Sequence, residues 1–579
     1  MEANSSAHDT SAAGIVARIR KALEQGAPWD ACDAFREAGE ALAGDADLLW
    51  WGALAHARSG AMHAAQVLLD RAEAASPSAA RLTDIQSMRG RLWKDAYHRG
   101  PQRPGATELA RRAFKEYLTA YGLDRDSFPG INAATLSWVL GDRDLAQRLA
   151  REVAATLAAQ AAPRNFWDVA TAGEAQLLLG HLDRAREQYA AAYADASSDA
   201  GSVATMRRQI SLLAPTLPEA RAILDVLPVP DVVAFAGHMI DAPTRPAPRF
   251  PRELVPAVEA AVRERLARFH RPIVYSSAAC GADLICIETA LATGAEVNIV
   301  LPFDRADFIR TSVAVGGDEW IARFDAAIAR AARVIMATEE NHLGDDVLFD
   351  HAAMLLEGFT CLRAAQLETM PSLLCVMDAA SDARVGGTHA TFARWRQHVG
   401  APQVIDLSEL RRRALPAPYP GRDDPLIAAS MSSAADREVA PVRSADVRPR
   451  RTLKTLLFAD FAGFSRLHDA MAPLFQERFW AIAAGEIAAS AAKPLLSTTW
   501  GDALYVVFEA PGEGADFALR FLDRMREADW PALGLPESSQ IRIALHAGPV
   551  FCGFDPIMRC DNYFGSSVTK AARIEPVTP

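Results

Sequence analysis

The chain of 579 residues lacks several features that would assign it to a protein class at once. It has seven cysteines but no CxxC pair, so neither a zinc site nor a disulfide framework is supported, and reduced thiols in the cytoplasm are the simpler interpretation. No stretch reaches the roughly 18 uncharged apolar residues that span a bilayer. The first residues also lack the basic-then-apolar order of a signal peptide. We therefore expect no membrane partner.

The chain also lacks an excess of positive charge, since 61 Lys and Arg residues are outnumbered by 72 Asp and Glu residues. The net charge is -11, and phosphate backbones are bound by basic surfaces, so nucleic acid is not expected as the main partner. What is present is ordinary for a globular protein, with 50% hydrophobic and 23% charged residues. The length is too great for one hydrophobic core. Changes in composition predict four parts: a helical regulatory domain at 1–225, an α/β domain at 228–410, a disordered linker at 411–450 and an α+β domain at 451–579.

The helical part contains a weak internal repeat. Gly60, Gly141 and Gly180 are each followed by small or apolar residues at offsets of five, nine and twelve. A glycine that ends one helix, followed by small residues in the next, predicts closely packed helical pairs. The pattern resembles tetratricopeptide (TPR) hairpins. "GRLWKDAYHR" and "DSFPGINAATL" look like the TRAFs-binding type of helical domain found beside stress-activated kinase kinases. The alternative is a plain α-solenoid without a special ligand. Solenoids offer a concave surface to a protein partner, but no residue here names that partner.

The part at 228–410 alternates apolar β-branched runs with helical stretches, which predicts a parallel sheet covered on both faces. Small residues follow three of the expected strands, in "FAGHM", "SSAACGADLICIETAL" and "GGTHATFARW". Such turns let backbone N–H groups approach a phosphate at a helix N-terminus. The ensemble resembles the SLOG superfamily of Rossmann-like domains that bind or process nucleotide derivatives. The residues predicted to bind a nucleotide are Gly237, Gly281, Asp283, Gly386, Gly387 and Thr388.

Alternatives remain open for this part of the chain. The small residues can serve packing alone. Asp283 and Glu288 can polarise a ribose, or they can cap and solvate the helix that carries them. A nucleotide-cleaving role for the same domain is a third, weaker hypothesis.

The part at 451–579 reads as strand, helix, hairpin, helix and strand, which predicts helices layered on a mostly antiparallel sheet. Asp460 and Asp502 each lie where an apolar strand meets a turn, with no basic partner beside them in the sequence. Two antiparallel neighbouring strands would bring them together as a cage for magnesium or manganese. The turn after Asp460 precedes a helix and offers N–H groups to a phosphate. The alternative is a pair of solvated turn aspartates.

Four segments, "LLFADFAGFSRL", "STTWGDALYVVF", "IRIALHAGPV" and "NYFGSSVTKAARI", occur in the order and spacing of class III nucleotidyl cyclases. This resemblance implies a ferredoxin-like catalytic domain in which Asp460 and Asp502 bind two Mg²⁺ or Mn²⁺ ions. It implies that Arg573 stabilises the transferring phosphate from the other protomer of a head-to-tail homodimer. It also implies that the triphosphate lies on Phe461, Ala462, Gly463, Phe464 and Ser465.

The sequence departs from the cyclase pattern at several positions. Thr498 stands where adenylate cyclases have a lysine that recognises the adenine base, and Asn562 stands at the second base-recognising position. These residues do not select a base, so the base preference of the domain is open and ATP is taken as the default substrate. Thr569 replaces an asparagine that helps to bind the ribose and transition state, so slower turnover is expected. Family members also continue beyond "RIEPVTP" with more strands, so we expect either a fragment or a domain that lacks one wall.

These observations lead to two main hypotheses. The first is a cytoplasmic enzyme that converts a nucleoside triphosphate to a 3′,5′-cyclic nucleotide and pyrophosphate, regulated by the upstream helical and nucleotide-sensing domains. The second is a catalytically degenerate cyclase-like domain within a nucleotide-sensing or interaction scaffold.

Overall fold

The computed structural model describes residues 11–575, with gaps at 25–27, 39–43, 76, 161–164, 197–198, 243–244, 246–247, 379–386, 416–450, 463, 465–467, 469–470 and 538. The chain divides into two compact units, Met1–Val229 and Pro230–Thr578. In the described residues, no helix has the length and apolar character that crossing a membrane requires.

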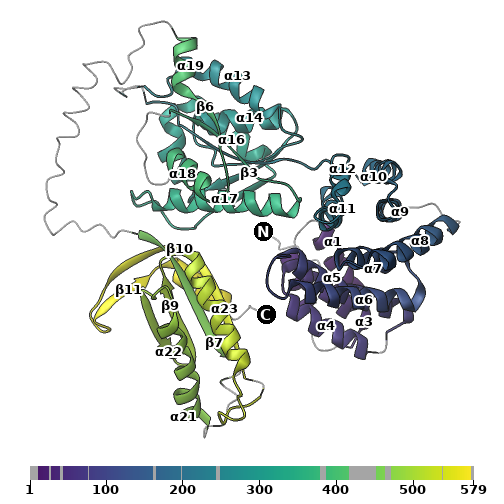
Figure 1. The fold of residues 1–579 in the computed structure, drawn as a ribbon. Coiled ribbons are helices and arrows are strands. Elements are labelled where there is room, and N and C mark those ends of the chain that lie inside the picture. The colour runs from purple at the N-terminus through teal and green to yellow at the C-terminus, as the bar shows by residue number, and fades with distance from the viewer. Residues whose placement is uncertain are drawn as a thin grey trace. The chain divides into compact units, whose positions relative to one another are not determined.

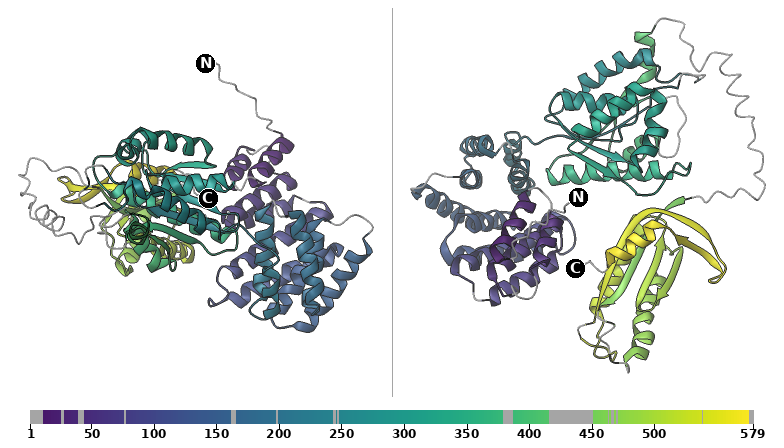
Figure 2. Two further views of the ribbon diagram at one scale, coloured as in Figure 1. Left: turned by 90° about the horizontal axis from the view of Figure 1, so that it is seen from above. Right: turned by 180° about the vertical axis from the view of Figure 1, so that it is seen from behind.

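The first unit is built from helices that follow one another in pairs joined by short turns (Figures 1 and 2). Neighbouring helices pack against each other along the chain, as in an α-solenoid. The helices are α1 (Ala12–Glu24), α2 (Pro28–Arg36), α3 (Ala46–Ser59), α4 (Met62–Ala74), α5 (Ala79–His98), α6 (Ala106–Asp124), α7 (Ser127–Val139), α8 (Arg143–Ala159), α9 (Phe166–Leu178), α10 (Leu182–Ala196), α11 (Ala200–Leu213) and α12 (Arg221–Leu224).

The repeat seen in the sequence corresponds to the turns inside the helical pairs. Gly60, Gly141 and Gly180 have φ angles of 89°, 95° and 83°, in the left-handed region that favours glycine at a helix end. The helix after each glycine packs against the preceding helix. The residues five, nine and twelve positions after the glycine are all buried: Ala65, Leu69, Ala72, Ala146, Ala150, Val153, Ala185, Tyr189 and Ala192. The predicted helical region and its pairing are therefore present.

The second unit contains a parallel sheet with strand order β4-β3-β2-β1-β5-β6. The chain moves outward from β1 through β4 and then returns to the other side of β1, so β1 and β5 flank the topological switch point where ligands of open α/β sheets bind. The strands are β1 (Val232–Gly237), β2 (Ile273–Ser276), β3 (Glu296–Leu301), β4 (Arg333–Met336), β5 (Ser372–Met377) and β6 (Gln403–Asp406).

Helices cover this sheet on both faces, as the alternating pattern predicts (Figure 1). Helices α13 (Val255–Leu266), α14 (Ala282–Ala292) and α16 (Asp318–Arg330) pack side by side, whereas α17 (Val347–Gln366) and α18 (Thr388–His398) pack together. The short α15 (Arg305–Phe308) precedes α16, and α19 (Leu407–Ala414) follows β6. Helix α19 reaches into the predicted linker because Asp406 caps its start and Arg411 forms an ion pair with Asp378. Residues 416–450 of that linker lie outside the described residues.

The second sheet of this unit is antiparallel, with strand order β11-β10-β7-β9-β8. Its strands are β7 (Arg451–Ala462), β8 (Leu496–Trp500), β9 (Ala503–Phe508), β10 (Gln540–Asp555) and β11 (Cys560–Phe564). The helices are α21 (Ala472–Leu474), α22 (Trp480–Ala489), α23 (Pro511–Glu527) and α24 (Ser566–Ile574), with a π-helical turn at Phe475–Phe479 between the first two.

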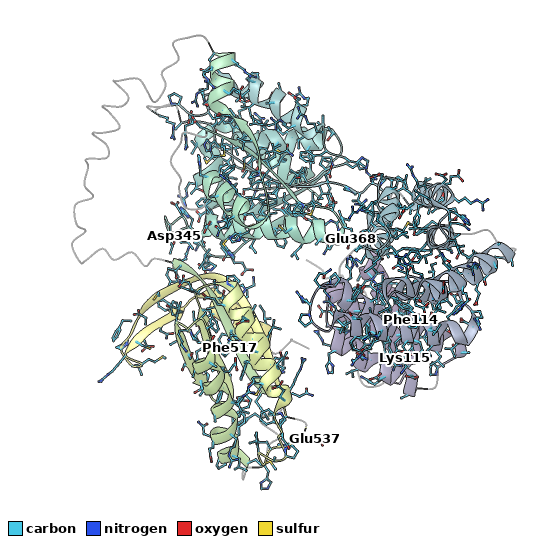
Figure 3. All side chains as sticks on the ribbon, viewed as in Figure 1. Phe114, Lys115, Asp345, Glu368, Phe517 and Glu537 are labelled. Carbon is cyan, nitrogen blue, oxygen red and sulfur yellow. The ribbon has the colours of Figure 1, made fainter. Side chains whose placement is uncertain are left out.

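Alternate residues of β7 enter two different apolar clusters. Leu457, Ala459 and Phe461 pack with residues of α22 and α23, including Phe517, which is labelled in Figure 3. Leu456 and Phe458 join a second cluster that includes Ala571 of α24. Because successive side chains of a strand point to opposite faces, the even-numbered positions of β7 share the face of α24.

Gly281 precedes α14 at a close crossing of the backbone. Its φ is +106°, and a Cβ there would lie 2.5 Å from the Ile240 nitrogen. We predict that Gly281→Ala destabilises the protein by about 2–3 kcal/mol, measured by chemical unfolding, because both backbone strain and a clash result. The control is Gly294→Ala, whose φ is +76° and whose Cβ would meet nothing within 4 Å. Equal losses in the two variants would contradict the predicted clash.

Candidate functional site

Asp460 and Asp502 lie together at one end of the antiparallel sheet. In the pairing of β7 with β9, Asp460 is opposite Ala503, and Asp502 is the residue just before Ala503, in the turn between β8 and β9. β7 is the middle strand of the sheet rather than an edge strand, so neighbours on both sides hold the backbone of Asp460 in place.

A basic residue accompanies this pair, contrary to the expectation from the sequence. In the pairing of β10 with β7, Arg542 is opposite Asp460, and its Nη2 donates to Asp460 Oδ2 at 2.8 Å. Arg542 Nε also lies 2.9 Å from Oε1 of Glu575, which follows α24. The sequence could not reveal these contacts, because Arg542 and Glu575 are separated from Asp460 by 82 and 115 positions.

The carboxylates of this group affect one another. The pKa of Asp502 is raised by burial first, and also by the charge of Asp460 and a hydrogen bond shared with it. Burial also raises the pKa of Glu575, with Arg542 opposing the change and both aspartates adding to it. Three carboxyl groups thus surround one guanidinium group. Their unequal number leaves an excess of negative charge that favours a cation.

The donor set fits a divalent metal only in part. In the described residues, no group of three or more His, Cys, Asp or Glu side chains is placed to hold a metal ion. Two carboxylates match Mg²⁺, which keeps several waters and is commonly held by one or two carboxylates together with substrate phosphates. Asp460 and Asp502 can therefore hold such an ion when phosphate oxygens complete its coordination.

The predicted triphosphate turn is only partly described. Phe461 is buried and its ring packs against Phe475 and Phe479, so its side chain serves the core. Phe464 also packs against Phe475, and Ala462 is the last residue of β7. Gly463 and Ser465 lie outside the described residues.

The two predicted base-reading positions come from opposite edges of the sheet, yet the sheet curls so that their neighbours meet. Thr498 on β8 pairs with Tyr505 on β9, and the Tyr505 hydroxyl donates to the carbonyl oxygen of Tyr563 on β11 at 3.4 Å. Asn562 precedes Tyr563, but its Nδ2 donates to Asp555 at 3.1 Å. The amide of Asn562 is thus engaged within its own hairpin.

Thr569 and Arg573 share one side of α24. Both are exposed, and residues four positions apart lie on the same helix face. Glu575, two positions after Arg573, is instead buried beside Arg542. Arg573 therefore faces away from the Asp460 group of its own chain.

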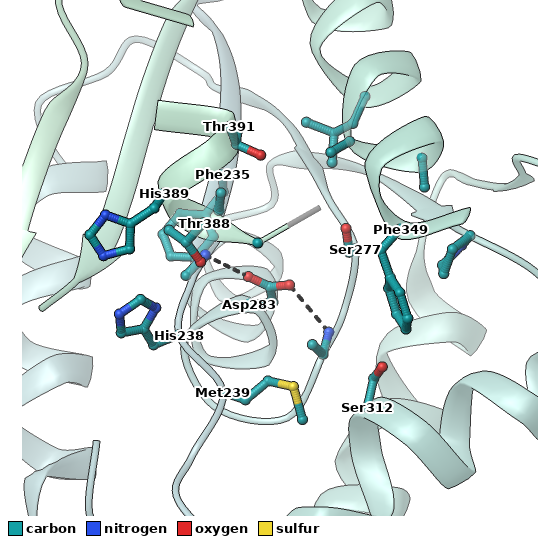
Figure 4. A pocket seen from close by; sticks show the side chains of 18 of the residues that line it. Phe235, His238, Met239, Ser277, Asp283, Ser312, Phe349, Thr388, His389 and Thr391 are labelled. Carbon is teal, nitrogen blue, oxygen red and sulfur yellow. Dashed lines mark hydrogen bonds between the residues drawn. The ribbon is translucent and has the colours of Figure 1, made fainter. Parts of the chain in front are cut away.

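A second pocket lies at the switch point of the parallel sheet (Figure 4). It is a cavity of about 250 Å³ at the carboxyl ends of the strands. Gly237, Asp283, Gly387 and Thr388 line it, which brings together four of the predicted nucleotide-binding residues. Helices α14 and α18 both begin at this pocket. Gly386 lies outside the described residues.

The acidic residues on α14 hold the structure around this pocket. The Asp283 carboxylate accepts hydrogen bonds from the backbone nitrogens of Gly237, at 3.0 Å, and Ala279, at 3.3 Å (Figure 4). Burial raises the pKa of Asp283 to about 7, and these two bonds oppose the rise. Glu288 forms an ion pair with Arg323 at 2.5 Å. Both carboxylates thus have partners within the protein.

The pocket also contains basic residues that the sequence did not single out. His238 and His389 lie with their ring centroids 5.7 Å apart (Figure 4). Arg249 also lines the cavity. The pKa of His238 is lowered to about 3 by burial first, and then by the positive charges of Arg249 and His389. Phe349 lies on the side of Ser312 and provides an apolar surface (Figure 4).

Comparisons with known proteins agree with parts of this description. Residues 9–137 match the family model Tetratricopeptide Repeats-Sensor, which confirms the prediction of TPR repeats for that segment. No curated protein matches the chain. Similar solved structures include a thermophilic TPR protein from Thermus thermophilus, with 20% identity, 35% of this chain and 99% of that chain covered, and a TM-score of 0.28.

Two further similar structures are cyclase domains. The guanylyl cyclase domain of the RhoGC fusion protein from Blastocladiella emersonii is 22% identical, with 23% of this chain and 79% of that chain covered and a TM-score of 0.20. The adenylyl cyclase CyaB from P. aeruginosa is 18% identical, with 23% and 76% covered and a TM-score of 0.20.

The raised pKa of Asp283 predicts a pH-dependent stability. Because its folded pKa of about 7 exceeds the ordinary 3.8, the stabilisation is complete below about pH 4 and is lost as the pH rises through 7. We expect the thermal unfolding temperature of the wild type to fall between pH 5 and pH 8. Asp283→Asn should show a flatter profile, since it cannot ionise. The same slope in both proteins would contradict the assignment.

Proposed function

We propose that the region from Arg451 onward is a nucleotidyl cyclase domain that forms a 3′,5′-cyclic nucleotide and pyrophosphate from a nucleoside triphosphate, with ATP as the default substrate. The observation that carries the proposal is the placement of Asp460 and Asp502. The two carboxylates meet at the end of adjacent strands, within the segments that resemble class III cyclases.

In the proposed reaction, the ribose 3′ oxygen forms a bond to the α-phosphorus while the bond from that phosphorus to the bridging oxygen breaks. Pyrophosphate leaves, and the hydroxyl proton passes to solvent. Asp460 and Asp502 would hold two Mg²⁺ or Mn²⁺ ions. When bound, these ions neutralise phosphate charge and lower the pKa of the attacking hydroxyl. Positioning by the protein supplies much of the remaining rate.

Arg542 has a defined part in this proposal. It neutralises Asp460 while no cation is present, and Glu575 gives the same guanidinium a second carboxylate. Asp460 can then turn toward a cation without leaving Arg542 unpaired, which would be costly for a partly buried charge.

A homodimer completes the proposed site. Thr569 and Arg573 share an exposed face of α24 and point away from the aspartates of their own chain, so they are available to a second copy. The head-to-tail arrangement implied by the family resemblance would place them against the partner's substrate.

The pocket of the parallel sheet is the proposed regulatory nucleotide site. Two helices begin at it, Arg249 supplies a positive charge, and Phe349 gives an apolar wall. His238, whose pKa is lowered to about 3 by burial, adds a neutral imidazole. This combination suits a phosphate joined to a flat base. No catalytic acid is assigned here, because Asp283 is engaged with the backbone, and binding is therefore favoured over cleavage.

The metal pair is tested by Asp460→Ala, with the exposed acid Asp523→Ala of α23 as the matched control. Purified protein is incubated with Mn²⁺ and each of the four triphosphates, and products are identified by mass. Loss of a metal ligand should lower formation of cyclic nucleotide by at least about a hundredfold, since even indirect contacts to a metal are worth 10–100-fold. The control should keep its activity.

The same experiment separates the enzyme from the scaffold hypothesis. Undiminished activity in Asp460→Ala would refute the assignment of the metal pair. Absence of cyclic product from all four triphosphates with the wild-type dimer would favour the degenerate scaffold, whose cyclase-like part serves only for association.

The regulatory pocket is tested by photolabelling the full chain with an azido-substituted adenine nucleotide. We expect labelled peptides from 232–240 or 387–398, and Arg249→Gln should reduce this labelling about tenfold through loss of one charged contact. Arg245→Gln is the matched control, because Arg245 pairs with Asp241 and does not line the pocket. Equal labelling in both variants would count against Arg249 as a phosphate contact.

A further inference from the structure

The helical unit contains a cavity of its own, lined by residues of that unit alone. It has a volume of about 170 Å³ and lies between α3, α5 and the start of α7. Arg58 of α3 and Arg91 of α5 line it, with Trp50, Met88 and Phe128 among the apolar walls. These helices are the first members of successive pairs, and such equivalent helices line one face of a solenoid.

Positive charge gathers on this side of α5. Lys94 lies three positions after Arg91, so both side chains share one helix face. Burial lowers the pKa of Lys94 to about 8, Asp95 and Glu174 oppose this change, and the charge of Arg91 adds to it. Burial also lowers the pKa of Arg58, and Arg91 adds to that change. Arg91 is therefore close enough to both cations to repel them.

Carboxylates lie near these three cations, since Asp95 and Glu174 act on Lys94 and Asp199 acts on Arg58, but in the described residues only Asp95 is within ion-pair distance of one of them. In the described part of the chain, Lys94 donates to the neutral amides of Asn132, at 2.6 Å, and Gln209, at 2.8 Å. Arg58 donates to a backbone oxygen at 3.4 Å, and Arg91 has one carboxylate, Asp95, at 3.6 Å.

Other arginines of α5 differ. Arg81 contacts Asp47 and Asp84, and Arg89 contacts Asp70 and Glu73. The carboxylate of Asp84, which also lines the cavity, is thus already engaged by Arg81. On α5, Arg91 and Lys94 thus have fewer carboxylate contacts than Arg81 and Arg89.

Two buried polar groups near the cavity also lack a partner within the described residues. The indole Nε1 of Trp50, which lines the cavity, has no hydrogen-bond acceptor. The hydroxyl of the fully buried Tyr117 has none either, and its ring lies 6.1 Å from that of Phe128 and 5.6 Å from the Lys94 ammonium group. Buried polar groups are seldom left unpaired unless a ligand or water satisfies them.

We propose that this cavity binds a small phosphorylated molecule, with the phosphate held by Arg58 and Arg91 and a flat ring placed against Phe128. A phosphate monoester carries about -1.5 to -2 charges at neutral pH, which matches two guanidinium groups better than a single carboxylate does. Phe128 is 50% exposed, so its ring is available for stacking at the cavity mouth. The enclosed volume suits a small molecule better than an extended peptide.

The test uses amide hydrogen exchange of the full chain, read peptide by peptide, with 5′-AMP as the probe and adenosine as its uncharged counterpart. We expect 5′-AMP to protect peptides from α3 and α5, and adenosine to protect them much less. Peptide-level mapping keeps this cavity distinct from the other two nucleotide sites, so failure here leaves the proposed cyclase function untouched.

The variant is the double substitution Arg58→Gln and Arg91→Gln. It should raise the 5′-AMP concentration needed for half-maximal protection about a hundredfold, because each charged hydrogen-bonding group contributes about tenfold. The matched control is Arg111→Gln with Arg112→Gln, an equal loss of charge on the exposed side of α6. Exchange without probe verifies that both variants are folded.

Three outcomes would overturn the proposal. They are equal protection by adenosine and 5′-AMP, undiminished protection in the Arg58 and Arg91 variant, and protection by an acidic peptide but not by 5′-AMP. If the double variant does not fold, Arg58→Lys with Arg91→Lys replaces it. That variant keeps the charge but loses the guanidinium fork, so it should weaken protection by about tenfold.

Discussion

The register of β7 between β9 and β10 is the constraint on which the candidate active site depends. It sets Asp460 opposite Ala503 on one side and Arg542 on the other. A slip of one residue would turn Asp460 from the face of α24 into the apolar cluster beneath α22 and α23. The alternation of buried residues along β7, with Leu457 and Phe461 in that cluster, opposes such a slip because an unpaired carboxylate would replace an apolar side chain.

A similar dependence on backbone geometry governs the pocket of the parallel sheet. Gly281 lets the chain after β1 pass close to the start of α14, and the Asp283 carboxylate ties the end of β1 to the turn before that helix. The two helix starts and the basic residues Arg249 and His389 then converge on one cavity. The acid on α14 is thus part of the support for the pocket, which explains why ionisation of Asp283 and stability are expected to be linked.

Three regions of this chain are proposed to bind a phosphate-containing ligand. They are the carboxylate pair of the antiparallel sheet, the pocket of the parallel sheet and the cavity of the helical unit. In the antiparallel sheet, carboxylates outnumber the single guanidinium, so the proposed function needs a cation before a triphosphate can approach. In the helical unit, two guanidinium groups, of Arg58 and Arg91, line the cavity with one carboxylate, Asp84, which Arg81 engages. In the two proposals, the sign of the uncompensated charge sets whether the phosphate would bind directly or through a metal.

The sequence by itself determined the local features: helical pairs ending at glycines such as Gly60, two classes of strand pattern, and aspartates at the strand ends. These local features can be predicted because they depend on the spacing of apolar residues and on side-chain type within a single helix or strand. Only the tertiary structure decided that Arg542 and Glu575 accompany Asp460, that Asp283 supports the backbone, and that Arg91 lies in a cavity. Such contacts join positions far apart in the chain, and strand register and helix packing, rather than local pattern, bring them together.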